Sequence, residues 1–145
     1  MNNMRKPNFN NLLKVLRCEV PDRPTLFEFF LNKAFYEKLS GQSLNDTEDS
    51  IAYWKMVIKA FENAGYDYTT IYASDFNFPQ GDIKIAKTCS LNDGNVISNR
   101  AEFEEYDWPD PDSHDYSRLE ILKQYLPEGM KFVVYGPGGV LENVI

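Results

Sequence analysis

The sequence predicts an α/β fold with parallel strands. Three short runs rich in apolar and β-branched residues, 25–30, 66–73 and 131–135, are separated by segments in which apolar residues recur at helical spacing. Strands that alternate with helices are typical of βα units, because a parallel strand needs a long crossover connection, which is usually a helix. We therefore expect the three runs to lie in one parallel sheet.

The composition indicates one ordinary globular domain. The chain has 145 residues, of which 43% are hydrophobic and 26% charged, enough for a sizeable core. Its net charge of −7 repels phosphate backbones, and no cluster of basic residues compensates for it. No apolar run approaches the roughly 20 residues of a membrane span, and no signal peptide is recognisable at the N-terminus. We expect a cytoplasmic protein with neither nucleic acid nor membrane as a partner.

The two cysteines, Cys18 and Cys89, lie far apart and form no CxxC motif. They are interpreted as free thiols of a reducing compartment, the alternative being a disulfide or a metal pair. A closed zinc site needs four nitrogen or sulfur ligands, whereas the chain has one histidine and two cysteines. We therefore expect no metal bound by this chain alone.

The first third of the chain predicts a helix, a strand and a second helix. Residues 9–17 form a short amphipathic helix that two prolines follow. The run 25–30 (TLFEFF) fits a strand buried on both faces. Its one acid, Glu28, then lies at an exposed strand end or is a buried carboxylate that needs a partner. Residues 32–39 predict a helix that stops at Gly41.

Residues 49–63 predict the strongest helix. Its apolar stripe consists of Ile51, Trp54, Val57, Ile58 and Phe61. We expect Asn45 or Thr47 to cap its start, with acids in the first turn, and Gly65 to end it in the left-handed conformation.

Asp75 follows the predicted strand 66–73 directly. The carboxyl ends of parallel strands carry the chemistry in open sheets and in barrels alike, so Asp75 is a candidate site residue. The alternative is that Ser74 and Asp75 form a polar turn or a helix cap.

The second half predicts a surface excursion and a third βα unit. Within 83–97, Asp-Gly between extended runs indicates a β-hairpin. The stretch 100–111 is acidic, aromatic and too rich in proline for a continued helix. Residues 117–125 predict a helix, residues 131–135 a strand, and residues 140–145 the first turns of another helix.

Two further features have both a functional and a structural interpretation. The glycine-rich loop 136–139 (GPGG) lets the backbone approach a ligand, or is simply a tight turn; it matches neither a P-loop nor GxGxxG. His114 has aspartates on both sides, and is either a proton shuttle or an exposed loop histidine. No pattern of a Ser/His/Asp catalytic triad has its sequence partners in place.

Three segments in order resemble the uroporphyrinogen decarboxylase superfamily, which also holds the corrinoid-linked methyltransferases. They are 11–24 (NLLKVLRCEVPDRP), 60–79 (AFENAGYDYTTIYASDFNFP) and 127–139 (PEGMKFVVYGPGG). The family fold is a TIM-type (β/α)₈ barrel. The resemblance implies that residues 1–145 are one N-terminal segment, an incomplete barrel of three βα units with a hairpin excursion after strand two. Three strands cannot close a barrel, so we expect a missing C-terminal half or a homo-oligomer.

The resemblance also implies roles for individual residues. Asp75 is similar to the catalytic aspartate at the centre of the family's substrate site. The decarboxylases grip substrate carboxylates with two arginines, whose positions are held here by Phe29 and Lys33, and neither offers a guanidinium fork. This departure speaks against a tetrapyrrole tetra-acid as substrate. The residues expected to bind a small-molecule substrate are Glu28, Phe29, Lys33, Gly136, Gly138 and Gly139.

The implied function is that of the methyltransferase branch. There a methyl group moves between a small donor, a corrinoid carried by a partner protein, and a thiol or folate acceptor. A zinc ion activates the thiol in some members, and its ligands lie in later strands. We expect no zinc or corrinoid bound by this chain alone, and no activity from it in isolation. The alternatives are a decarboxylase acting on a tetrapyrrole or other carboxylate, with Lys33 as anion contact, and a non-catalytic α/β interaction module.

Overall fold

The computed structural model describes residues 5–43, 50–79 and 96–137. The chain divides into two compact units, and each is described by itself. The first, called the sheet unit, comprises the described residues up to Tyr72 together with 116–135. The second, called the turn unit, comprises residues 73–79, 96–115 and 136–137.

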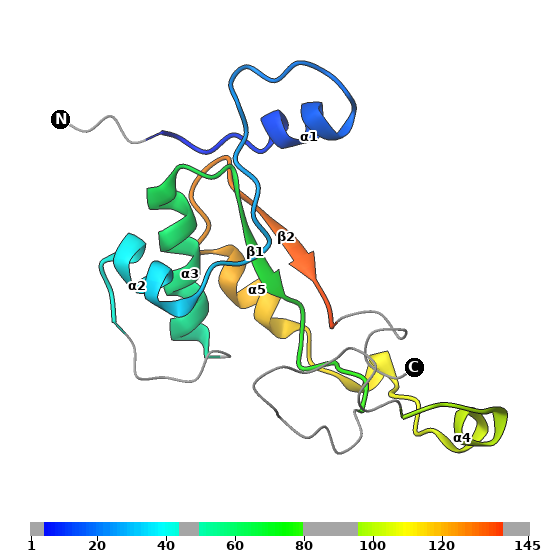
Figure 1. Cartoon of the computed structure of the whole chain (residues 1–145). Helices are drawn as coiled ribbons and strands as arrows, with labels where there is room; N and C mark the ends of the chain where they lie inside the picture. The colour runs from blue at the N-terminus through cyan, green and yellow to red at the C-terminus, as the bar shows by residue number, and fades with distance from the viewer. Residues whose placement is uncertain (1–4, 44–49, 80–95, 138–145) are drawn as a thin grey trace. The chain divides into compact units, whose positions relative to one another are not determined.

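The sheet unit contains two parallel strands, so the predicted α/β class is confirmed (Figure 1). Strand β1 (Tyr68–Tyr72) pairs with β2 (Lys131–Tyr135) in a register that places Tyr68 opposite Lys131 and Tyr72 opposite Tyr135. Both strands are rich in β-branched and aromatic residues, which fit a pleated and partly buried surface. Helix α5 (Ser117–Lys123) precedes β2 along the chain, as expected of a βα unit.

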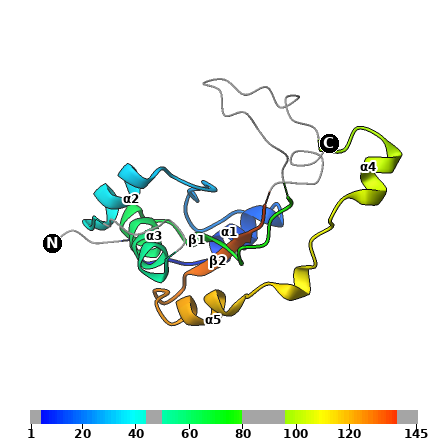
Figure 2. The same cartoon turned by 90° about the horizontal axis from the view of Figure 1, so that it is seen from below.

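One helix packs directly on this sheet and a second helix packs on the first. Helix α3 (Ile51–Ala64) packs on β1 and also contacts α5, while α2 (Lys33–Ser40) packs on α3. Figures 1 and 2 show α2 on the side of α3 that faces away from the strands. Helix α1 (Asn10–Leu16) belongs to the same unit. Among the residues that the structure describes, no helix is long and apolar enough to span a membrane.

The ends of α2 and α3 follow from their capping residues. The side chain of Asn32 accepts the N–H of Phe35, and that of Ser50 accepts the N–H of Tyr53. The prediction that Asn45 or Thr47 caps α3 is therefore wrong. Ser50 takes the role because the helix begins at Ile51, and for the same reason no acid lies in its first turn. Gly65, at φ 87°, ends α3 in the left-handed conformation, as predicted.

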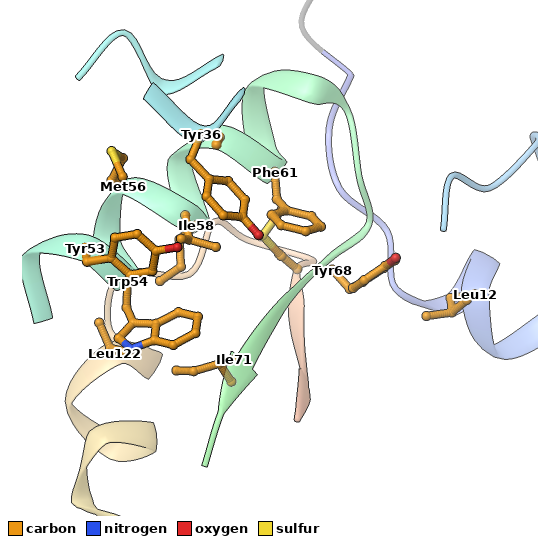
Figure 3. Packing of buried hydrophobic residues seen from close by; sticks show 13 residues of the cluster. Leu12, Tyr36, Tyr53, Trp54, Met56, Ile58, Phe61, Tyr68, Ile71 and Leu122 are labelled. Carbon is orange, nitrogen blue, oxygen red and sulfur yellow. The ribbon is translucent and has the colours of Figure 1, made fainter. Parts of the chain in front are cut away.

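The core of the sheet unit lies between α3 and the strands. Met56, Val57, Ala60 and Phe61 of α3 are completely buried. Figure 3 shows Phe61 of α3 among side chains from other elements, including the aromatic rings of Tyr36 from α2 and Tyr68 from β1. The remaining buried hydrophobic residues of the cluster are Leu12, Tyr36, Tyr53, Trp54, Ile58, Tyr68, Ile71, Leu122 and Met130. Helix α3 is thus the main contributor to the core, with Met56 and Ala60 buried beside the predicted stripe and Ile51 of that stripe only half-buried.

The run 25–30 is not a strand, which corrects the prediction of a strand buried on both faces. The hydroxyl of Tyr68 accepts the N–H of Glu28 at 2.6 Å and donates to its carbonyl at 2.7 Å. The hydroxyl of Tyr36 accepts the N–H of Leu31 at 2.8 Å. Tyrosine hydroxyls thus make hydrogen bonds to backbone groups that a neighbouring strand would bind if the run were in the sheet. The phenylalanines of the run remain exposed.

The turn unit contains a short helix, α4 (Arg100–Glu105), and a 3₁₀ turn, η1 (Pro111–Ser113). The sequence did not predict α4. It forms because Asn99 accepts the N–H groups of Ala101 and Glu102 and because the helix ends before the first proline of the acidic stretch. The predicted hairpin 83–97 lies outside the described residues except for its last two, which are not in a strand. The helix predicted for 140–145 lies outside them as well.

Candidate functional site

Asp75 lies in a tight polar turn three residues after β1 in the chain. The buried side chain of Ser74 accepts the N–H of Phe76 at 3.0 Å, which is the hydrogen bond of a serine turn. Ser74 and Asp75 therefore do form a polar turn, which was the alternative to a functional role for Asp75. The Asp75 side chain is nevertheless 72% exposed, so its carboxylate is accessible to a ligand.

His114 is positioned by the 3₁₀ turn that precedes it. Proline begins this turn, and the Asp110 side chain accepts the N–H of Asp112 at 3.0 Å. The Ser113 hydroxyl donates to the Asp110 carbonyl at 2.8 Å. The N–H of His114 then donates to the carbonyl of Pro111 at 3.4 Å. These local bonds fix the backbone from which the imidazole extends.

The turn after β1 and the 3₁₀ turn bring Asp75 and His114 together. His114 Nδ1 lies 2.8 Å from Asp75 Oδ1, although 39 residues separate the two in the chain. The ring of Phe76 meets the imidazole edge-on, with centroids 5.2 Å apart and planes at 90°. Only 21% of the His114 side chain is exposed. We call Asp75 and His114 the Asp–His pair.

The Asp–His pair has the composition of an acid–base site. An ionised carboxylate only accepts hydrogen bonds, so Nδ1 carries the hydrogen of this contact. When the imidazole is neutral, its Nε2 is then the atom able to accept a proton. Asp75 and His114 are separate candidates in the sequence, and no pattern in the sequence joins them. The one available signal was that His114 is the only histidine of the chain.

The other predicted substrate residues fall into both units. Glu28, Phe29 and Lys33 belong to the sheet unit, whereas Asp75, His114 and Gly136 belong to the turn unit. Glu28 is exposed but lies in no strand, so it is neither a buried carboxylate nor the end of a strand, the two interpretations that the sequence left open. Its backbone holds the Tyr68 hydroxyl, and burial raises the pKa of that phenol to about 12.

Phe29 and Lys33 do not resemble an anion clamp. The Phe29 ring is 51% exposed and packs edge-on against Phe27, with centroids 5.2 Å apart. Lys33 is half-buried at the first position of α2. A carboxylate here would meet one ammonium group and an aromatic ring rather than two guanidinium forks.

The glycine loop after β2 is described only in part. A Cβ atom added to Gly136 would meet nothing within 4 Å, so no close neighbour within the described residues requires a glycine there. Gly138 and Gly139 lie outside the described residues.

The described residues do not supply a complete metal site. They contain no group of three or more His, Cys, Asp or Glu side chains placed to hold one ion. The Asp–His pair offers two ligands at most, whereas a catalytic zinc site uses three protein ligands and a structural site four. Cys18 is exposed and its thiol forms no disulfide within the described residues, and Cys89 lies outside them.

A second charged cluster has a structural role. Asp67, only 2% exposed at the start of β1, accepts the N–H of Asn8 at 2.8 Å and pairs with both Arg5 and Arg23. It lies before β1, at the amino end of the strand, where residues of parallel sheets serve stability rather than chemistry. The cluster ties the N-terminal segment to the sheet.

Comparison of the chain with models of protein families, with curated proteins and with solved structures finds no match in any of the three.

Proposed function

We propose that this chain supplies the first βα units of a TIM-type barrel enzyme from the methyltransferase branch of the uroporphyrinogen decarboxylase superfamily. The observation that carries the proposal is an exposed aspartate, Asp75, three residues after the end of the first of two paired parallel strands. Loops at the carboxyl ends of such strands hold the ligands of barrel enzymes. The order of three family-like segments in the sequence adds to this support.

The methyltransferase branch fits the described residues better than the decarboxylase branch. Recognition of several carboxylates requires strong paired donors, and bidentate arginine contacts provide them. The two corresponding positions hold Phe29, with half of its ring exposed, and Lys33. An apolar face with one positive charge suits a small methyl donor better than a multiply charged acid.

Asp75 would act as a hydrogen-bond acceptor and negative charge beside the ligand. An exposed carboxylate can receive N–H donors of a substrate or lie close to a positively charged methyl donor. The methyl group itself would be carried by a corrinoid on a partner protein. Since the methyl group depends on that partner, we expect no methyl transfer by this chain alone.

The proposal is tested by titrating trimethylammonium, a small methylated cation with one N–H donor, into the purified chain and following the heat of binding. We expect binding that weakens about tenfold in Asp75→Asn, the loss of roughly 1.4 kcal/mol that one hydrogen bond to a charged group supplies. Asp107→Asn is the matched control, because it removes the same charge from an exposed site in the same unit. Absence of binding to the wild-type chain would overturn the proposal, and methyl transfer to a thiol without a partner would overturn its inactivity.

A second candidate, an interaction module, is favoured by one observation. The segment before α2 exposes four large apolar side chains, and α2 adds one more. These residues are Leu26, Phe27, Phe29, Phe30 and Phe35. Exposed apolar side chains gathered in one segment are typical of association sites. For this second candidate, we propose that two copies of the chain associate through the apolar side chains of this segment.

Light scattering of the purified chain tests that alternative. We expect a mass above that of one chain for the wild type, and a monomer for the double variant Phe29→Ser, Phe30→Ser. Val20→Ser is the control, because it removes an apolar side chain that is 88% exposed outside the segment. A monomeric wild-type chain at high concentration would rule the alternative out.

A further inference from the structure

We infer that His114 is a general base whose Nε2 accepts a proton from a hydroxyl or thiol group, with Asp75 as its positioning residue. The inference concerns proton transfer within the turn unit. It goes beyond the proposed methyl transfer and would hold whichever group the enzyme transfers.

The contact with Asp75 decides which ring nitrogen of His114 carries the hydrogen. A neutral imidazole carries one hydrogen, on Nδ1 or on Nε2. The contact of 2.8 Å to Asp75 Oδ1 requires that hydrogen on Nδ1, since the carboxylate cannot donate. Nε2 then has a free lone pair, and the carboxylate stabilises the cation that forms when Nε2 takes up a proton.

The orientation of the ring is fixed as well. Phe76 lies edge-on to the imidazole, and the 3₁₀ turn at Pro111–Ser113 holds the His114 backbone. A base held in one orientation needs little reorganisation when a ligand arrives. The exposed fraction of 21% leaves the ring partly shielded from water yet reachable.

Such an arrangement performs general base catalysis. When water attacks the carbonyl carbon of an ester, a C–O bond forms while the O–H proton passes to Nε2. The tetrahedral intermediate then breaks its bond to the leaving alcohol, which departs with the electron pair, and Nε2 returns its proton to that alcohol or to solvent. With a thiol as nucleophile, the S–H proton follows the same route and a thioester results. No oxidant or further reactant is needed.

The tautomer is tested by ¹⁵N NMR of the chain labelled at histidine. Because the chain has one histidine, its two ring nitrogens give the only imidazole signals. We expect the neutral ring to carry its hydrogen on Nδ1 in the wild type and on Nε2 in Asp75→Asn. Asp107→Asn should match the wild type. A wild-type ring protonated on Nε2 would overturn the inference.

Proton acceptance is tested with p-nitrophenyl acetate, alone and with 2-mercaptoethanol. We expect the wild-type rate above background to fall about 100-fold in His114→Gln and about tenfold in Asp75→Asn, with Asp107→Asn unchanged. Acceleration without the thiol identifies water as the proton donor, and acceleration only with it identifies a thiol.

Equal rates for the wild type and His114→Gln, with the variant folded by circular dichroism, would overturn the inference. Acetylated His114 detected by mass spectrometry would overturn it as well, because the imidazole would then be a nucleophile rather than a base. A failure of trimethylammonium to bind would refute the proposed methyl transfer and leave these results unaffected.

Discussion

The hydroxyl of Tyr68 makes two hydrogen bonds to the backbone of Glu28. It accepts the N–H at 2.6 Å and donates to the carbonyl at 2.7 Å. Tyr68 is a completely buried residue of β1, so the bonds join the core to an otherwise exposed segment. One side chain thus satisfies both backbone groups of a residue that the sequence places in a strand.

Removal of this hydroxyl should loosen the segment without destroying the fold. Tyr68→Phe is expected to lower the free energy of unfolding by about 1 kcal/mol, because water can replace the lost partner at an exposed backbone. The amide of Glu28 should then exchange with deuterium faster. Tyr106→Phe, which removes a hydroxyl bonded to the Pro79 carbonyl, is a control that should leave the Glu28 amide unchanged. Unaltered Glu28 exchange in Tyr68→Phe would contradict the expectation.

The same phenol should make the fold sensitive to alkali. Burial raises the pKa of Tyr68 from 10.0 to about 12, mainly because a phenolate is disfavoured away from water. The unfolded chain therefore loses its proton at a lower pH than the folded chain. Stability is fully present below pH 10 and is lost as pH rises through about 12. Melting temperatures from pH 8 upward should fall in this window, less steeply in Tyr68→Phe, whereas parallel curves would contradict the assignment.

Asp67 should be among the most sensitive positions in the sheet unit. Asp67→Asn leaves Arg5 and Arg23 facing each other without their shared carboxylate, and we expect a loss of about 3 kcal/mol in urea unfolding. Asp22→Asn provides the comparison. It breaks an exposed pair with Lys14, 2.6 Å long, and should cost less than about 1 kcal/mol. Similar losses in the two variants would show that the cluster does not hold the N-terminal segment.

Two glycines with positive φ should respond differently to a side chain. Gly41, at φ 71°, has nothing within 4 Å of an added Cβ, so Gly41→Ala should cost only the backbone strain of about 1 kcal/mol. Gly129, at φ 83°, would place its Cβ against the carbonyl of Pro7, and its own carbonyl accepts the N–H of Phe9 at 2.9 Å. Gly129→Ala should cost about 3 kcal/mol. Equal thermal shifts in the two variants would contradict this contact.

Local patterns predicted most of the sheet unit. The apolar stripe of residues 49–63 predicted α3. Gly65 predicted its end, because a glycine that adopts the left-handed conformation ends a helix through local backbone hydrogen bonds. The runs 66–73 and 131–135 became β1 and β2. The errors arose where local signals competed. Ser50 was overlooked as a cap, and α4 forms within a stretch whose prolines argued against it.

The sequence by itself determined four of the five helices that the structure describes (α1, α2, α3 and α5), the two runs that form β1 and β2, and that Asp75 follows a strand, because periodicity and turns act over a few residues. Tertiary structure alone decided that the Tyr68 hydroxyl is hydrogen-bonded to the backbone of the run 25–30, and that His114 lies beside Asp75. Both relationships join residues about 40 positions apart. Contacts at that separation depend on how turns and packed elements place side chains in space, and no local pattern encodes that placement.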